Sequence, residues 1–183
     1  MLNIIAGTLS VGVTPSTSSY ESIATVTVGS GGAANVEFTS IPSTFEHLQL
    51  RMITRTTSSP FVNVQYNSDT TASNYRSHFL YGNGSSAVAT TAADKAYIAY
   101  TSVSSNQANE FGDAVTDILD YKNTNKYKTA RSLSGNDQNG GGFVLLFSHL
   151  WMSTSAISSI KILPVAGDFE QYTKIALYGI KGS

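Results

Sequence analysis

Three histidines, His47, His78 and His149, are the first candidates for metal or acid–base chemistry. Each lies in a different segment and has apolar neighbours rather than other possible ligands. No HExxH motif or paired-histidine spacing would place two imidazoles on one metal ion. The pattern therefore favours histidines at core edges or between strands, and we expect no metal site and no cofactor.

Asp113, Asp117 and Asp120 form an acidic cluster within one short segment. Two such carboxylates could act as an acid–base pair in glycoside cleavage. With Asp137 and Asn139 they could also bind calcium, although the D-x-D-x-D-G loop pattern is missing. We favour a third interpretation, in which they pair with basic residues of the same hairpin: Lys122, Lys126, Lys128 and Arg131.

The remaining candidates carry weaker signals. Serine is abundant, but no G-x-S-x-G nucleophile motif is present, and the glycines of 29–32 are not followed by the GK[ST] of a phosphate-binding loop. Aromatic residues could stack on sugars in a lectin-like groove, although tyrosines are also ordinary strand and interface residues, which we favour. These aromatics are Tyr66, Tyr75, Tyr81, Tyr97, Tyr100 and Trp151. We predict no catalytic residue and a protein that is not an enzyme.

The composition limits the classes of protein to which the chain can belong. The 183 residues (19.4 kDa) suit one domain with a real core. Charged residues are only 13%, against about 25% in an ordinary soluble domain, so the surface can meet other protein with little charge desolvation. The net charge of −1 argues against a nucleic-acid partner. With 0 cysteines, disulfides and thiolate chemistry are excluded.

No targeting segment is evident. The first seven residues lack the basic region and long apolar stretch of a signal peptide, and no segment approaches the roughly 20 apolar residues of a membrane span. We expect synthesis in a cytoplasm and no membrane partner.

Alternation of apolar and polar residues predicts about ten strands 8 to 15 residues apart. The predicted strands are 20–28, 34–41, 45–57, 60–67, 75–81, 95–103, 143–151, 157–165 and 172–180, together with a hairpin at 112–135. The first two are expected to pair across a glycine-rich tip, 87–93 to be a loop, and 143–151 to be buried on both faces. This spacing, without a long amphipathic helix, predicts an all-β fold, an antiparallel, jelly-roll-like β-sandwich.

The hairpin at 112–135 organises the predicted fold. Its first strand has an apolar side made by Val115, Ile118, Leu119 and Tyr121. Residues 122–126 form a polar turn, and Tyr127, Thr129, Arg131 and Leu133 alternate along the second strand. We expect its charges to act as cross-strand pairs that fix the register of the hairpin.

The first 19 residues have two open interpretations. A short apolar piece is followed by a Ser/Thr/Pro stretch, which suits either a first strand with its linker or an arm that docks on a neighbouring molecule. We assign 1–19 to an arm and linker, and 20–183 to the β-sandwich domain. The residues predicted to contact a partner are Leu2, Ile4, Ile5, Leu9 and Val11.

Several segments together resemble a group of tailed-bacteriophage virion structural proteins. They are HLQLRMITR (47–55), SNYRSHFLYGNGSS (73–86), DILDYKNTNKYKTARSLSG (117–135), LWMSTSAISSIKILP (150–164) and YTKIALYGIKG (172–182). The resemblance covers about residues 30 to 182 and is most specific at DYKNTNKYKT and ALYGIKG. It implies a structural protein of the virion and brings no catalytic residues.

Because only about 20 residues precede the predicted sandwich, we expect a capsid decoration (cement) protein rather than a fibre. Its partners would be the major capsid protein and copies of itself, as a homotrimer on the outside of the head. The alternative is a tail-fibre or head-fibre module that binds glycan on the host surface. A third hypothesis is a polysaccharide depolymerase that uses Asp113 or Asp117.

Overall fold

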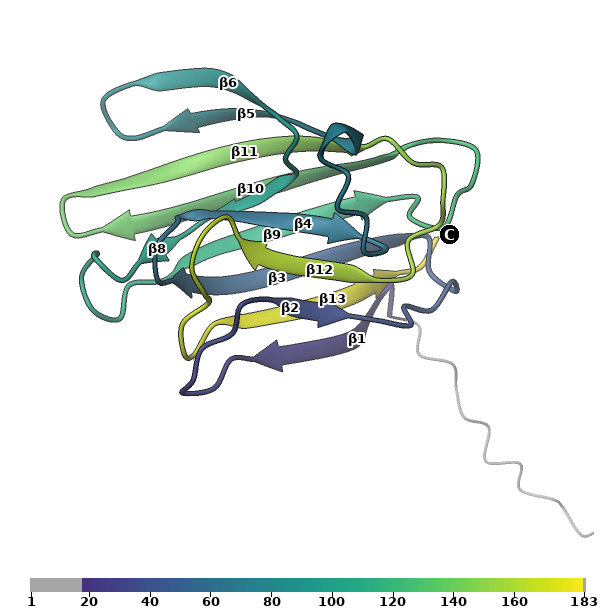
Figure 1. Cartoon of the computed structure of the whole chain (residues 1–183), viewed down its shortest axis with the longest axis horizontal. Helices are drawn as coiled ribbons and strands as arrows, with labels where there is room; N and C mark the ends of the chain where they lie inside the picture. Colours follow the sequence, from purple (N-terminus) through teal and green to yellow (C-terminus); the bar gives the residue numbers. More distant parts are fainter. Residues whose placement is uncertain (1–17, 183) are drawn as a thin grey trace, which may run out of the picture.

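A computed structural model describes residues 18–182. These residues form two β-sheets packed face to face (Figure 1), which confirms the predicted all-β sandwich. There are 13 strands rather than about ten, and one 3-10 turn, η1 (Ala72–Asn74). That turn lies in the polar loop between the fourth and fifth strands. Residues 1–17, with the predicted contact residues Leu2, Ile4, Ile5, Leu9 and Val11, lie outside the described part.

The large sheet has nine strands, eight of which form one antiparallel path. In spatial order these are β1 (Tyr20–Thr27), β13 (Lys174–Ile180), β3 (His47–Thr56), β9 (Gly112–Leu119), β10 (Lys128–Gln138), β11 (Gly141–Trp151), β5 (Tyr75–Gly82) and β6 (Ala87–Ala93). The short β8 (Ser102–Val103) pairs in parallel with the end of β3. The small sheet runs in the order β2 (Val36–Phe38), β12 (Ile160–Pro164), β4 (Phe61–Tyr66) and β7 (Tyr97–Tyr100).

The chain moves between the sheets in the order of a jelly roll. It passes from β2 in the small sheet to β3 in the large one, back to β4, and then to β5 and β6. It returns to β7, crosses to β9–β10–β11, and returns once more to β12. An eight-stranded jelly roll has four strands in each sheet; here the three-stranded meander β9–β10–β11 takes the place of one strand. β1 and β13 widen the large sheet at the other side.

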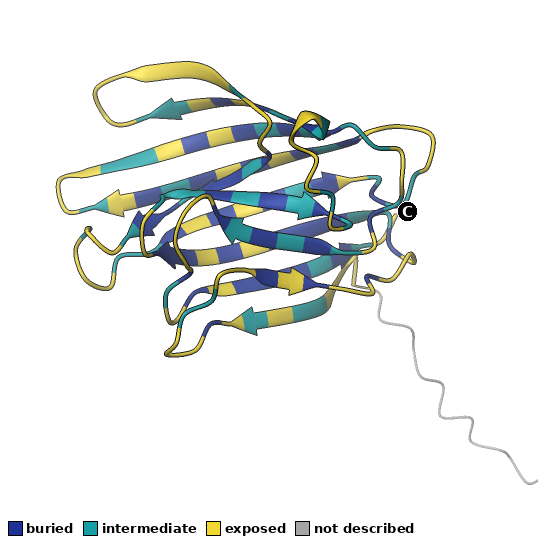
Figure 2. Cartoon of the chain, in the orientation of Figure 1, coloured by how far each residue is buried: buried dark blue, intermediate teal, exposed yellow. Residues whose placement is uncertain are grey.

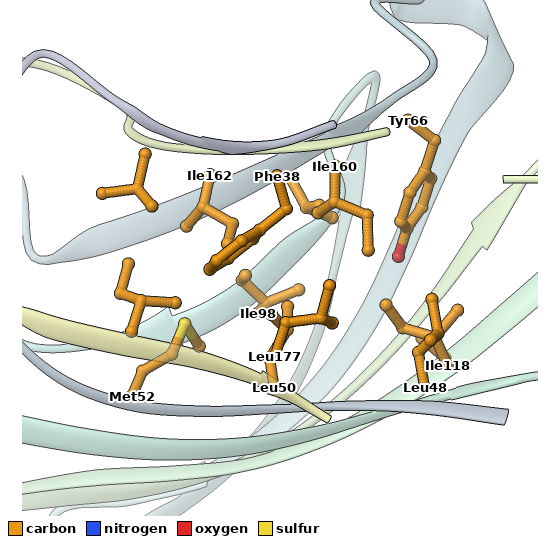
Figure 3. Packing of buried hydrophobic residues seen from close by; sticks show 14 of the residues in the cluster. Phe38, Leu48, Leu50, Met52, Tyr66, Ile98, Ile118, Ile160, Ile162 and Leu177 are labelled. Atoms are coloured by element: carbon orange, nitrogen blue, oxygen red, sulfur yellow. The ribbon is translucent and has the colours of Figure 1, made fainter. Parts of the chain in front are cut away.

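The core lies between the sheets and is made by alternate residues of each strand. In β3, the fully buried Leu48 and Leu50 point inward with Met52, as the alternation predicts. They meet Phe38, Ile160 and Ile162 of the small sheet, with Tyr66 and Ile98 in the same layer (Figure 3). This packing confirms that residues 45–57 form a central strand with one core face.

Small hydroxyl side chains allow β7 to pack closely on the meander. The inner face of β9 and β10 carries the buried residues Thr116, Ser132 and Ser134 where a core would ordinarily hold larger apolar groups. The Ser134 hydroxyl donates to the Tyr100 carbonyl (3.1 Å) and accepts from the Tyr100 backbone N–H (2.9 Å). The Ser132 hydroxyl donates to the Ile98 carbonyl. These bonds satisfy backbone groups at the edge of the small sheet that burial would otherwise leave unpaired.

Two predicted connections are wrong. Strands β1 and β2 do not form a hairpin, because β1 pairs with β13 and β2 with β12. The glycine-rich segment 29–32 instead carries the chain from one sheet to the other. Residues 87–93 are not a loop but strand β6, which pairs with β5 from Arg76↔Ala93 to Gly82↔Ala87.

Two predictions of burial are also wrong. Val115 and Leu119 lie on the solvent face of β9 rather than in the core, where Ala114, Thr116 and Ile118 point. Strand β11 is buried on one face only, since Val144 and Leu146 are exposed. In Figure 2, β10 and β11 alternate between buried and exposed segments, as strands covered on one side do.

Candidate interaction surface

The solvent face of the large sheet carries an uninterrupted row of apolar residues. Val115 pairs with Leu133, Leu133 with Leu146, and Leu146 with Leu80 in the register of the sheet. Opposite residues in antiparallel strands point to the same face, so these four side chains form one line across β9, β10, β11 and β5. We call this row the apolar band.

The apolar band is open to solvent. Leu133, Leu146 and Leu80 are 59%, 49% and 55% exposed, and Val115 is 39% exposed. The five strands from β9 to β6 span about 24 Å, and eight residues of a strand extend about 26 Å. The face therefore offers roughly 600 Å², near the 800 Å² or so that one partner contributes to a standard protein interface. This area is that of the whole face, including polar residues such as His78 and Arg131. Within it the apolar band forms a contiguous exposed apolar patch, and such patches often mark interaction sites.

Shallow grooves run beside the apolar band. A groove of about 430 Å³ lies between His78, Leu80, Arg131 and Leu146. A second, of about 390 Å³, borders Leu80 and Leu146 from the other side and reaches Val144. The surface is therefore ridged enough to seat apolar side chains of a partner, with Arg131 and His78 at its polar margin.

A second opening lies where β5 extends beyond the small sheet. We call it the aromatic opening; it is a groove of about 320 Å³ lined by Phe61, Phe79, Tyr81, Thr90, Tyr100, Phe143 and Leu145. The Phe61 ring stacks on Tyr97 at 4.7 Å and meets Tyr100 edge-on at 5.0 Å. Burial raises the pKa of the Tyr100 hydroxyl, with Tyr81 adding to the effect. The Tyr100 hydroxyl therefore stays neutral at physiological pH.

Of the aromatics singled out in the sequence, half lie in the core. Tyr66, Tyr75 and Trp151 are buried, which agrees with their interpretation as ordinary strand residues. The Trp151 indole N–H donates to the carboxylate of Asp69 at 2.8 Å. Burial acts to raise the pKa of Asp69, but hydrogen bonds from Trp151, Asn74 and Thr71 outweigh it and lower the pKa to about 2. The other three tyrosines lie at or beside the aromatic opening.

The aspartates of β9 are widely spaced along the strand. Asp113 and Asp117 point to the same solvent face, four residues apart, so their Cα atoms are about 13 Å apart. Glycosidase carboxyl groups are separated by about 5 to 9.5 Å. Asp117 accepts a hydrogen bond from Gln49 Nε2 at 2.8 Å on the neighbouring β3, which suits a role in the sheet surface.

The charges of the hairpin pair only in part as predicted. Lys126 bonds Asp120 across the turn, and this bond lowers the pKa of Asp120, helped by the positive charge of Lys126 and by His47. Lys122 pairs instead with Glu46, at 3.2 Å. Lys128 is buried, and its Nζ donates to the carbonyls of Lys126 and Thr154 rather than to an aspartate. Burial, with Lys126 nearby, lowers the pKa of Lys128.

The histidines lie on three separate strands, as predicted. His47 Nδ1 accepts the backbone N–H of Asp120 at 3.0 Å. His78 lies on the solvent face beside the apolar band. His149 is buried on the opposite face of its sheet, with Nε2 2.6 Å from the Tyr66 hydroxyl. Within residues 18–182, no group of three or more His, Asp or Glu side chains is placed to hold a metal ion.

Sequence reasoning missed both the apolar band and the aromatic opening. From the sequence, Val115 is assigned to the apolar side of its strand and Leu146 to a strand buried on both faces, whereas Leu80 and Leu133 are assigned to neither face. Only the register of four strands shows that these residues share the outer face. The available signal was the alternation in 143–151: Val144 and Leu146 are two and four residues before the polar Ser148, so all three point to the same face of the strand.

In the part of the chain that the structure describes, no helix is long and apolar enough to cross a bilayer. Comparison with protein-family models, with curated proteins and with solved structures found no match to this chain.

Proposed function

We propose that this chain is a non-enzymatic structural protein of a bacteriophage virion, and that it decorates the outside of the head. The observation that carries the proposal is the apolar band on a broad face of the large sheet. Such a face can add contact area between capsid subunits, which resists the internal pressure of packaged DNA. The low charge content of the surface and the resemblance of the five sequence segments to virion proteins support the same role.

The mode of action would be purely adhesive. Burying apolar surface is worth roughly 25 cal/mol per Å², and association costs reduce the net affinity of each contact. A contact of modest affinity repeated over many copies would still reinforce a shell. The proposal includes contacts of the chain with the major capsid protein and with copies of itself.

The alternative function is glycan recognition by a tail fibre or head fibre. One observation favours it: the aromatic opening combines ring faces with the hydroxyls of Tyr81 and Tyr100. Aromatic rings with a polar tip suit a ligand with both apolar and hydroxyl surfaces.

Copy number in purified virions separates the two functions. Quantitative gel electrophoresis or mass spectrometry against the major capsid protein would give hundreds of copies per particle for a head decoration protein. A fibre would be present in a few to a few tens of copies, and that result would overturn the decoration proposal in favour of the alternative. Complete absence from the particle would contradict both.

A further inference from the structure

Strand β6 has no fully buried residue although it belongs to the large sheet. Six of its seven residues are exposed and Ala92 is partly buried. Figure 2 shows this strand exposed along nearly its whole length, at the margin where β5 and β6 extend beyond the small sheet. Strands are ordinarily stabilised by packing at least one face, so β6 is held mainly by its hydrogen bonds to β5, and a further strand at its edge would stabilise it.

The free edge of β6 also lacks the features that prevent edge pairing. Its sequence, AVATTAA, contains no charge and no proline, and its register with β5 is regular. The opposite edge of the sheet, β1, is different. It has a register shift between Ser22 and Ala24 and a Glu21–Lys181 ion pair at 3.1 Å. Bulges and charges are the usual protection of edge strands against pairing with another chain.

We propose that β6 pairs with β6 of a second copy, antiparallel and about a two-fold axis at Thr90. This inference goes beyond the proposed function, because it concerns a contact between copies that forms in solution, with or without a capsid. The occupant is a second copy because the strand is complementary to itself. With Thr90 on the axis, Ala89 faces Thr91 of the second copy and Val88 faces its Ala92.

The flanking residues also tolerate this register. The charged residues next to β6 in the sequence are Asp94 and Lys95, which follow it, and Asp94 pairs with Arg76 of β5 at 2.9 Å. The two-fold register places Asp94 opposite Ser86 of the second copy, so no like charges meet. The pairing joins the two large sheets into one continuous surface. The apolar band reaches β6 at Ala89, so the bands of the two copies lie side by side, offset by two residues along the paired strands. Because the pairing is two-fold symmetric, it produces a dimer, which differs from the homotrimer expected from the sequence.

A single cysteine tests the pairing directly, because the chain contains 0 cysteines. Opposite residues in an antiparallel pair have Cβ atoms about 4.5–5.5 Å apart, within reach of a disulfide after small adjustment. Under mild oxidation Thr90→Cys should yield a covalent dimer. Thr25→Cys is the matched control, an exposed threonine on the β1 edge, and should stay monomeric on a non-reducing gel.

A charge at the axis gives the second readout. Thr90→Lys places two lysines opposite each other in the dimer, which destabilises it, and should raise the dimer dissociation constant about tenfold or more in analytical ultracentrifugation. Thr25→Lys should leave that constant unchanged. The pairing is refuted if the native chain is monomeric at tens of micromolar concentration, or if it forms a trimer that Thr90→Lys leaves intact. Circular dichroism of each variant confirms that the strands are retained.

Discussion

The stability of the protein should fall as the pH drops from 6.5 toward 4.5, by up to about 1.4 kcal/mol per pH unit from His149 alone. His149 is buried in the core with Tyr66 and Trp151 around it. Burial, and to a smaller extent Arg131, lowers the pKa of His149 from 6.5 to about 3. Its Nδ1 has no hydrogen-bond partner among the described residues, so no acceptor stabilises an N–H at that position of a protonated ring.

The sign follows from the order of the two pKa values. Below pH 6.5 the unfolded chain takes up a proton on His149, whereas the folded chain does not until about pH 3. Proton uptake therefore stabilises the unfolded state over this window, and the folding stability present above pH 6.5 is progressively lost. Between pH 6.5 and 4.5 the loss should be about 2 kcal/mol, and most of this range lies above the ordinary titration of carboxyl groups.

Urea unfolding at several pH values measures this slope, with the single Trp151 as the fluorescent reporter. His149→Gln keeps a side-chain hydrogen-bonding group near Tyr66 but does not titrate, so the slope between pH 6.5 and 4.5 should largely disappear. His78→Gln, on the solvent face, is the control and should retain the native slope. An unchanged slope in His149→Gln would show that His149 is not buried as a neutral ring.

Removal of the Arg55 guanidinium should destabilise the fold by about 3–5 kcal/mol, because this buried group pairs with the partly exposed Glu170 and also satisfies backbone carbonyls. Arg55 Nε donates to Glu170 at 2.8 Å. Its Nη1 donates to the carbonyls of Gln107 and Glu110 at 2.9 and 2.7 Å. The arginine therefore joins the end of β3 to the 104–110 loop and to the segment before β13. Its loss leaves Glu170 and four carbonyls of that loop without this partner.

Arg55→Ala should lower the thermal midpoint by roughly 6–20 °C, given the shift per kcal/mol for a chain of this size. It should also make the 104–110 loop cleave faster in limited proteolysis. Arg51→Ala is the matched control, because Arg51 lies on the solvent face of the same strand and contacts Gln49 and the rings of Tyr20 and Tyr178. Its loss should cost about 1 kcal/mol or less. Equal effects of the two variants would contradict the structural role assigned to Arg55.

Local patterns in the sequence were enough to predict the sandwich and most of its strands. The alternation around Leu48, Leu50 and Met52 predicts β3 and its core face, because side chains of a strand point alternately to opposite sides. The polar run 122–126 predicts the turn between β9 and β10, which the pairing of Leu119 with Thr129 confirms. These elements are specified by residues close together in the chain.

Features that depend on distant partners could not be predicted in this way. AVATTAA has no apolar alternation, so only its pairing with β5 makes it a strand. Lys128 was expected to pair with an aspartate of its hairpin, and Arg55 carried no local signal, yet both are buried because carbonyls from other segments accept their hydrogen bonds. Whether Leu146 faces the core or solvent depends on which face the small sheet covers, and this is decided by the topology of the whole fold.

Binding to undecorated phage heads tests the central claim most directly. Purified protein would be mixed with heads assembled without it and the bound fraction measured by co-sedimentation. We predict that the wild-type chain and Val165→Lys, a matched exposed apolar position outside the apolar band, saturate the heads alike. Leu146→Lys, which puts a charge in the centre of the band, should weaken binding about tenfold or more. Absence of wild-type binding, or full binding by Leu146→Lys, would contradict the account.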